Sequence, residues 1–387
     1  MSSFTVEKKT TEAYWPRRPG STVLADDKLT IVYNKFKTTA SIPSNAVRYN
    51  LIFAHGTGMN KAIWTYIIKK LYEYSQNSNG KWYLDSCLAF DAVSHGDSAI
   101  INQGKIGWVY QWEEGGKDLL KVLKHEMHTT GDFQNNLTSR NIAIGHSLGG
   151  YGVVLAGFYD PNVLDSIIPI EGVLYSDDKS LTRFTKLFSK IGSLLMDTFD
   201  SERDFNDYYR VYSFYKTIHP EVMNDFLQDE LITVVENGET KYKSKTPTNA
   251  QMASYLGSTL SLKLVMSLYP WLRVPVCHVI GSEAKWNPPE TAPYVRSTIP
   301  KKYLSATYDI PKGEHLVHAE QPDYTSKIIE EFILKRQVDF ESEKVTSYSE
   351  LKNGTDRNKL KEIEFGNLLT GNFAKVSGYA DSIFSKF

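Results

Sequence analysis

The sequence has few of the features that mark specialised classes of protein. Only two of its 387 residues are cysteine, Cys87 and Cys277, and both lie inside apolar runs, which excludes a disulfide scaffold and predicts two buried thiols. The 44 lysines and arginines balance 45 aspartates and glutamates, so charge gives no reason to expect nucleic acid or an anionic membrane as a partner. What remains is the composition of an ordinary globular protein, with 41% hydrophobic residues.

Long apolar runs are also missing. No uninterrupted stretch is long enough to span a bilayer, and the N-terminal residues "MSSFTVEKKTTEAYWPRRPG" lack the apolar core of a secretory signal peptide. We therefore expect a soluble, intracellular chain. The last residues, Ser385, Lys386 and Phe387, are similar to the Ser-Lys-Leu address of peroxisomal import apart from the final phenylalanine, and the alternative is a frayed end.

What the sequence does contain is an alternation of short apolar strands with helical patterns, which predicts an α/β fold with a mostly parallel central sheet. After the strand ending near residue 172 the pattern becomes largely helical and aromatic for roughly 100 residues, and Asn237-Gly238 predicts a hairpin within it. We expect a core of residues 1–174 and 272–335, an insertion of residues 175–271 and a C-terminal extension of residues 336–387. The predicted strands cover residues 28–36, 49–56, 86–93, 141–147, 165–172, 274–282 and 304–310.

The stretch "IAIGHSLGGYG" places a serine between a strand and a glycine-rich helix start. Gly145, Ser147 and Gly149 fit the pattern G-x-S-x-G, in which glycines two residues before and after the serine let strand and helix approach each other. No Walker lysine follows, and G-x-G-x-x-G is not matched, so a nucleophile is favoured over a phosphate-binding loop. The helix expected to begin at Leu148 would point an N–H group at an oxyanion.

A serine nucleophile needs a base, and His315 follows the predicted last strand in a Gly-x-His loop. His318 is expected to be a surface or capping residue, and His146 to be structural. A second oxyanion donor is expected from the backbone of Thr57, in the loop "HGTG" after an early strand, paired with that of Leu148.

The motifs "HGTG", "DAVSHGDS", "GHSLGG" and "GEHLVHAEQPD", in this order, resemble those of the α/β-hydrolase superfamily over about residues 28–335. That resemblance implies a cap domain after the sixth strand, here residues 175–271. The stretches "HGTGMNKAIW", "HGDSAI", "SIIPIEG" and "KWNPP" more narrowly resemble the fungal peroxisomal lipase and its relatives. This implies a peroxisomal serine esterase or lipase, with the cytoplasm as the alternative location and the import receptor as a partner through residues 385–387.

In the α/β-hydrolase superfamily an acidic residue completes a catalytic triad with the serine and the histidine. At this residue the sequence departs from the commoner superfamily pattern. The acid usually follows the seventh strand, but Ala284 stands at that place and Glu283 is one residue away. The superfamily's other location is the end of the sixth strand, where Glu171 lies. Glu171 is therefore favoured, Glu283 is the alternative, and Asp309 is a third candidate.

These residues predict hydrolysis of carboxylic esters, acyl or lipid esters above all, through an acyl-enzyme and with no cofactor. A serine at position 147 argues against dehalogenase or epoxide hydrolase chemistry, which uses aspartate there. Thioesterase, carbon–carbon bond hydrolase and a non-catalytic binding protein stay open. Phe184 and Phe188 could line an acyl pocket or pack the cap. No metal site is expected, because His125 and His128 are three residues apart and a zincin helix needs four.

Overall fold

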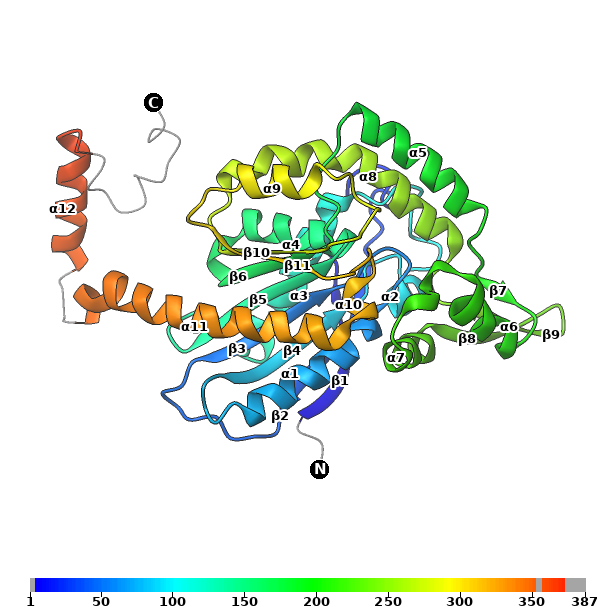
Figure 1. Cartoon of the computed structure of the whole chain (residues 1–387), viewed down its shortest axis with the longest axis horizontal. Coiled ribbons are helices and arrows are strands. Elements are labelled where there is room, and N and C mark those ends of the chain that lie inside the picture. Colours follow the sequence, from blue (N-terminus) through cyan, green and yellow to red (C-terminus); the bar gives the residue numbers. More distant parts are fainter. Residues whose placement is uncertain (1–3, 353–356, 373–387) are drawn as a thin grey trace. The chain divides into compact units, whose positions relative to one another are not determined.

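The computed structural model describes residues 4–352 and 357–372, so Ser385, Lys386 and Phe387 lie outside the described residues. Eight strands form one sheet in the order β1-β2-β4-β3-β5-β6-β10-β11, in which β2 is antiparallel to β1 and β4 and the pairs from β4 to β11 are parallel (Figure 1). The expected mostly parallel α/β sheet is confirmed. The strands are β1 (Phe4–Glu12), β2 (Thr30–Thr38), β3 (Arg48–Ala54), β4 (Tyr83–Phe90), β5 (Ser139–His146), β6 (Ser166–Ile170), β10 (Val276–Gly281) and β11 (Leu304–Ile310).

Each of the seven predicted strands overlaps an observed one, but β1 was not predicted. β1 pairs with β2 along its whole length at the edge of the sheet, and most of its side chains are exposed. An edge strand that is exposed on both faces has no need of alternating apolar residues, so its sequence reads as a polar stretch.

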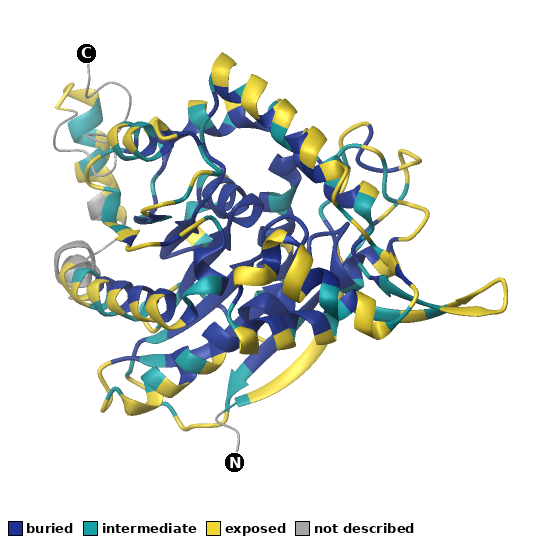
Figure 2. Ribbon diagram, turned by 45° about the vertical axis from the view of Figure 1, so that its right-hand side comes forward, coloured by how far each residue is buried: buried dark blue, intermediate teal, exposed yellow. Residues whose placement is uncertain are grey.

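Helices cover both faces of the sheet. On one face α1 (Thr65–Asn77) contacts the start of α11 (Pro322–Lys352), where the hydroxyl of Tyr66 donates to Asp323 at 3.1 Å. On the other face α3 (Trp112–Thr129) packs on α4 (Leu148–Tyr159), and the rings of Trp112 and Tyr151 meet edge to face. Figure 2 shows the buried residues concentrated in the central strands and α4. The remaining helices of this face include α9 (Thr291–Thr298), and α2 (Gly96–Ile101) and α10 (Val317–Glu320) follow β4 and β11.

Residues 1–333 form one compact unit, and residues 334–387 form a second. In the described part of the second unit, α11 continues to Lys352 and is followed by α12 (Arg357–Leu369). None of the helices in the described ranges combines the length and apolar character needed to cross a membrane. Both cysteines are buried and free, as expected.

The segment between β6 and β10, residues 171–275, is called the inserted segment below. It combines helices with a small antiparallel sheet, and the predicted hairpin is confirmed, since Asn237 and Gly238 both have positive φ between β8 and β9. Its elements are α5 (Asp178–Gly192), β7 (Thr198–Phe199), α6 (Glu202–Asp207), α7 (Pro220–Glu230), β8 (Leu231–Glu236), β9 (Glu239–Ser244) and α8 (Thr248–Leu268).

Buried polar contacts join the inserted segment to the sheet domain. The Lys61 ammonium lies 3.0 Å from Asp91, 2.8 Å from Asp97 and 2.5 Å from Asp229, which belongs to α7. Burial opposes the charge on Lys61, but the three carboxylates raise its pKa overall. Next to it the Asn60 amide donates to Glu230 at 2.8 Å. An ammonium buried this deeply is stable only while its partners stay in place, so this cluster fixes α7 against the loop after β3.

The edge strand β1 and its neighbour β2 are tied to α3 by a second group of charges. Lys9 of β1 and Lys35 of β2 each lie 2.6 Å from the carboxylate of Glu126, which also accepts a hydrogen bond from Tyr33. These contacts give the exposed strand β1 a polar anchor in place of an apolar face.

Candidate active site

Ser147 stands at the sharp turn between β5 and α4. Its φ of +52° lies in a region that L-residues rarely adopt. A Cβ atom at Gly145 would lie 2.1 Å from the carbonyl oxygen of Gly149, and one at Gly149 would lie 2.2 Å from that of Ala54. Both glycines are therefore required for the close approach of strand and helix, which is the reason for the G-x-S-x-G spacing.

The chain brings Ser147, His315 and Glu171 together from three different loops. His315 lies between β11 and α10, and its Nε2 is 3.1 Å from the Oγ of Ser147. Its Nδ1 is 3.1 Å from Oε2 of Glu171, the first residue after β6. With the Nδ1 proton donated to the carboxylate, Nε2 is free to accept the serine proton. Burial lowers the pKa of His315, which keeps the imidazole neutral and able to act as a base.

Glu171 is held through both oxygens of its side chain. The carboxylate is buried, with the residue 2% exposed, and its Oε1 accepts the backbone N–H of Gly281 at 2.8 Å. The amide of Asn287 donates to Oε2 at 3.2 Å. Burial raises the pKa of Glu171 to about 7, although both hydrogen bonds act to lower it. Its φ of +47° adds a second strained residue to the site.

Glu283 and Asp309, the competing candidates for the acid, have different surroundings. The side chain of Glu283 is exposed, and its backbone N–H donates to the carbonyl of Gly313. Asp309 forms an ion pair with Arg296 of α9. Asn287, which was not among the residues predicted from the sequence, contacts Glu171 from the loop that usually carries the acid.

Two further histidines pack behind His315. His146, expected to be structural, donates its Nε2 proton to the backbone carbonyl of His315 at 2.8 Å. The expectation that His318 is a surface or capping residue is wrong: it is fully buried, and its ring stacks on that of His146 with centroids 3.9 Å apart. Trp64 covers His318 as well, with ring centroids 4.7 Å apart. Burial lowers the pKa of both histidines, so they provide uncharged packing that supports the loop of His315.

The two residues expected to supply the oxyanion donors lie in segments next to Ser147. Leu148 is the first residue of α4, and the N–H groups of a first helical turn have no acceptor inside the helix. Thr57 lies in the loop after β3, next to Gly56, where an added Cβ would lie 3.2 Å from Cβ of Ser147. Thr57 and Leu148 are both buried. This arrangement can stabilise negative charge developing beside the serine.

Aromatic residues of the inserted segment gather near His315. Phe184 and Phe188 of α5 are buried and stack in parallel, and Phe188 also stacks on Tyr255 of α8. Trp286, from the loop after β10, lies 6.5 Å from Phe188 and 5.8 Å from Tyr255 between ring centroids. Trp286 also stacks on His315, so these residues pack α5 against α8 and form an apolar wall that reaches the histidine.

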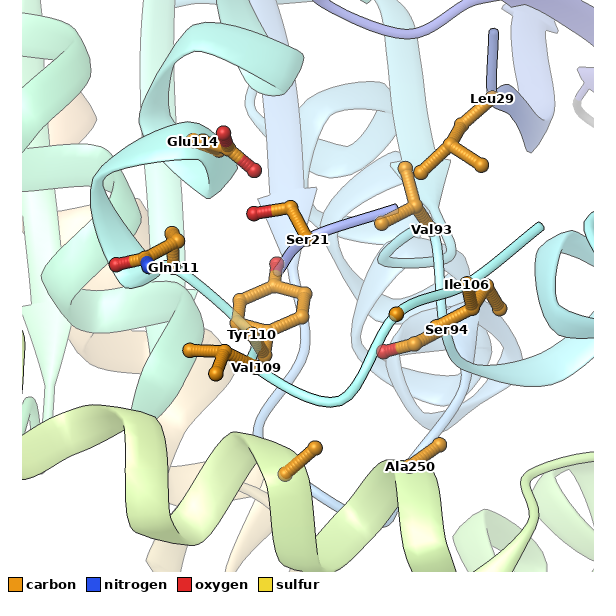
Figure 3. Close-up of a pocket in the computed structure, with 12 residues that line it drawn as sticks. Ser21, Leu29, Val93, Ser94, Ile106, Val109, Tyr110, Gln111, Glu114 and Ala250 are labelled. Carbon is orange, nitrogen blue, oxygen red and sulfur yellow. The ribbon is translucent and has the colours of Figure 1, made fainter. Parts of the chain in front are cut away.

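Two small cavities meet at Tyr110, and one of them reaches the site. The first is lined by residues from the N-terminal segment, the loop after β4 and α8, among them Ser21, Val93 and Ala250 (Figure 3). The second borders His55 and Leu148 at the start of α4, and Tyr110 lines both. The second cavity therefore adjoins the helix start that points toward Ser147.

Within the described residues, a group with the geometry of a metal site consists of Asp91, Asp97 and Asp229. The ammonium of Lys61 already lies between these carboxylates and neutralises part of their charge. The cluster therefore serves as an ion-pair network.

Known proteins resemble this chain over most of its length. The sequence profile described as "Alpha/beta hydrolase family" matches residues 51–328. The chain is 28% identical over 355 residues to the peroxisomal membrane protein LPX1 of Saccharomyces cerevisiae, covering 86% of this chain and 89% of that protein. A solved structure of the peroxisomal alpha-beta-hydrolase Lpx1 from that yeast matches with a TM-score of 0.77 and 27% identity, over 88% of this chain and 91% of that one. A type I acyl-CoA thioesterase, mpaH of Penicillium roqueforti, is 25% identical over 171 residues, which is 44% of this chain and 36% of that protein.

Proposed function

The chain belongs to the α/β hydrolase family, and from this premise we propose that it is a serine hydrolase that cleaves carboxylic esters through an acyl-enzyme. The observation that carries the proposal is the line of contacts from Ser147 Oγ to His315 Nε2 and from His315 Nδ1 to Glu171, both 3.1 Å long. A nucleophile, a base and a carboxylate that orients the base are the three parts that acyl transfer requires.

The reaction then runs in two halves. His315 Nε2 takes the proton of Ser147 as Oγ attacks the ester carbonyl, and the backbone N–H groups of Thr57 and Leu148 hold the oxyanion. Nε2 returns this proton to the leaving alcohol, which departs and leaves the acyl group on Ser147. A water molecule then gives a proton to Nε2 as its oxygen attacks the acyl carbon. Nε2 returns this proton to Oγ of Ser147 as the bond between Oγ and the acyl carbon breaks, and the carboxylic acid departs. Glu171 stabilises the imidazolium in both halves.

We assign residues 175–271 of the inserted segment as a cap over a core of residues 1–174 and 272–335, with residues 336–387 as a C-terminal extension. The aromatic contacts that run from Phe184 through Phe188 and Tyr255 to Trp286 support this assignment, because Trp286 in turn stacks on His315 and so links α5 and α8 to it. An apolar wall at this place suits an acyl or lipid chain.

A thioester is the second candidate substrate, because thioesters use the same triad and the partial match to an acyl-CoA thioesterase favours this chemistry. Carbon–carbon bond hydrolysis and a non-catalytic binding role are also compatible with this fold. A protein that only binds its ligand has no need of a strained serine in contact with a histidine, which favours catalysis.

We also propose a peroxisomal location, with the cytoplasm as the alternative. The similarity to a peroxisomal protein of yeast over 86% of the chain supports it, as does the terminal sequence Ser385, Lys386, Phe387, through which the import receptor would bind.

Hydrolysis of nitrophenyl acyl esters of increasing chain length, followed by acyl-CoA thioesters, tests the catalytic proposal. We expect the wild type to turn over with a chain-length optimum, and Ser147→Ala to lose about 10⁶-fold in kcat. Ser297→Ala, at an exposed serine of α9, is the matched control and should keep wild-type rates. Hydrolysis that survives Ser147→Ala contradicts the proposal. If the wild type hydrolyses neither esters nor thioesters, the result favours a non-catalytic binding role.

A further inference from the structure

The loop between β10 and α9, residues 282–290, contacts the triad at two points. Asn287 donates to the carboxylate of Glu171 and to the backbone carbonyls of Glu171 and Gly172, at 3.2 to 3.3 Å. Trp286, one residue earlier, lies against His315. The loop that carries alanine at the usual place of the acid therefore still reaches both the acid and the base.

The contact between Trp286 and His315 is a parallel stack. The centroids of the indole and the imidazole are 4.9 Å apart, and their planes differ by 10°. A second ring, that of His146, lies 5.0 Å from the imidazole at an angle of 50°. Both imidazole nitrogens bond within the ring plane, to Ser147 and Glu171. In-plane hydrogen bonds fix where the ring points but resist tilting weakly, whereas a stacked indole limits tilt directly.

Trp286 also touches the inserted segment on its other side. Its ring lies 5.8 Å from Tyr255 of α8 and 6.5 Å from Phe188 of α5, and these two rings stack on each other. A change in the position of α5 or α8 would therefore reach the catalytic imidazole through one side chain.

We propose that Trp286 is a positioning residue that holds the His315 ring in the plane joining Ser147 and Glu171. Through Trp286, a shift of α5 or α8 changes the orientation of the His315 imidazole. This inference rests on the proposed serine hydrolase function. The groups that face the imidazole are Glu171 from the end of β6, His146 from β5 and His318 from α10, the two histidines being uncharged. Substitution of Trp286 changes none of these groups.

The test compares Trp286→Leu with Trp286→Phe, which keeps a flat ring, and with Trp108→Leu at a tryptophan that is 70% exposed. We expect kcat/KM of the ester optimum to fall about 10²-fold in Trp286→Leu, only a few-fold in Trp286→Phe and not at all in the control. Because burial lowers the pKa of His315 and the indole is part of its cover, the acidic limb of the kcat/KM profile should move up by about one pH unit in Trp286→Leu alone.

A second measurement needs no turnover. The ring proton resonance of His315, assigned by its absence in His315→Gln, is titrated by NMR in the wild type and in both Trp286 variants. The same upward shift in Trp286→Leu supports the proposal. A loss of activity with an unmoved acidic limb and an unmoved titration overturns it, as does wild-type activity in Trp286→Leu. If the wild type cleaves no ester or thioester, the proposed function fails, and the titration still reports whether the indole controls the imidazole.

Discussion

Replacing Glu171 by glutamine tests which carboxylate completes the triad. In the wild type Oε1 accepts the Gly281 N–H, and Oε2 accepts from Asn287 and faces His315 Nδ1. Glutamine has only one acceptor oxygen. If its NH₂ group faces Gly281, two donors oppose each other in a buried place. If it faces His315, Nδ1 must become an acceptor, the ring proton moves to Nε2, and Nε2 can no longer accept the proton of Ser147.

The second arrangement resembles the tautomer error that costs serine proteases about 10⁴-fold in kcat. At about 1.36 kcal/mol for each tenfold change, this loss corresponds to roughly 5 kcal/mol of barrier. Glu171 is 2% exposed, so bulk water cannot take over its role without a rearrangement of the Gly281 and Asn287 contacts. We therefore expect kcat of Glu171→Gln to fall about 10³- to 10⁴-fold while KM changes only a few-fold, because the described partners of the carboxylate are Gly281, Asn287 and His315.

The assay is the initial rate of ester hydrolysis at saturating and limiting substrate, with the melting temperature measured in parallel to show that the variant is folded. Glu283→Gln is the matched control, since its side chain is exposed and lies in the neighbouring loop. Its rates should stay within about twofold of the wild type. The assignment of Glu171 as the carboxylate that orients His315 is wrong if Glu171→Gln keeps a tenth or more of the wild-type kcat. It is also wrong if Glu283→Gln loses more kcat than Glu171→Gln.

Two further predictions concern stability and location. Burial opposes ionisation of Glu126, but hydrogen bonds from Lys35 and Lys9 lower its pKa from 4.5 to about 2. The ionised Glu126 therefore contributes at most about 3 kcal/mol to the free energy of unfolding. This contribution is fully present above pH 4.5 and is lost as the pH falls toward 2. Denaturant unfolding should show Glu126→Gln less stable than the wild type at pH 7, with the difference in unfolding free energy reduced to less than half at pH 3; an equal difference at both pH values would contradict this. A fluorescent protein fused to the N-terminus of the chain, which leaves the C-terminus intact, should enter peroxisomes, and the same fusion without the last three residues should remain cytosolic. A cytosolic signal from the intact fusion would refute the proposal that these three residues act as a peroxisomal targeting signal.

The parts of the site that follow from local chemistry could be predicted from the sequence. The G-x-S-x-G stretch is constrained by the close approach of β5, β3 and α4, so the glycines at 145 and 149 identify Ser147 without knowledge of the rest of the fold. His315 follows from chain order after the last strand. The central strands β3, β4, β5 and β6 are apolar because they are buried on both faces, which makes them recognisable in the sequence, whereas β1 is mostly exposed and has no such pattern.

The parts that depend on distant segments were predicted only in part. Motif position favours Glu171 over Glu283 but leaves Glu283 open, because the choice depends on which carboxylate approaches the loop of His315, and nothing in the sequence near Glu171 indicates its positive φ. His318 was expected to be exposed because it opens a short helix, but that helix is buried by ring contacts from Trp64 and His146. Stacking partners that lie more than 150 positions apart leave no local signal.

The cluster around Lys61 limits how parts of this protein can be exchanged. Lys61 and Asn60 follow the loop of Thr57, while Asp229 and Glu230 belong to the inserted segment. A chimera that took the inserted segment of another hydrolase would remove one of the carboxylates around a buried ammonium and leave Asn60 without Glu230. The inserted segment and the loop of Thr57 therefore depend on each other structurally, and a graft of the inserted segment has to carry both.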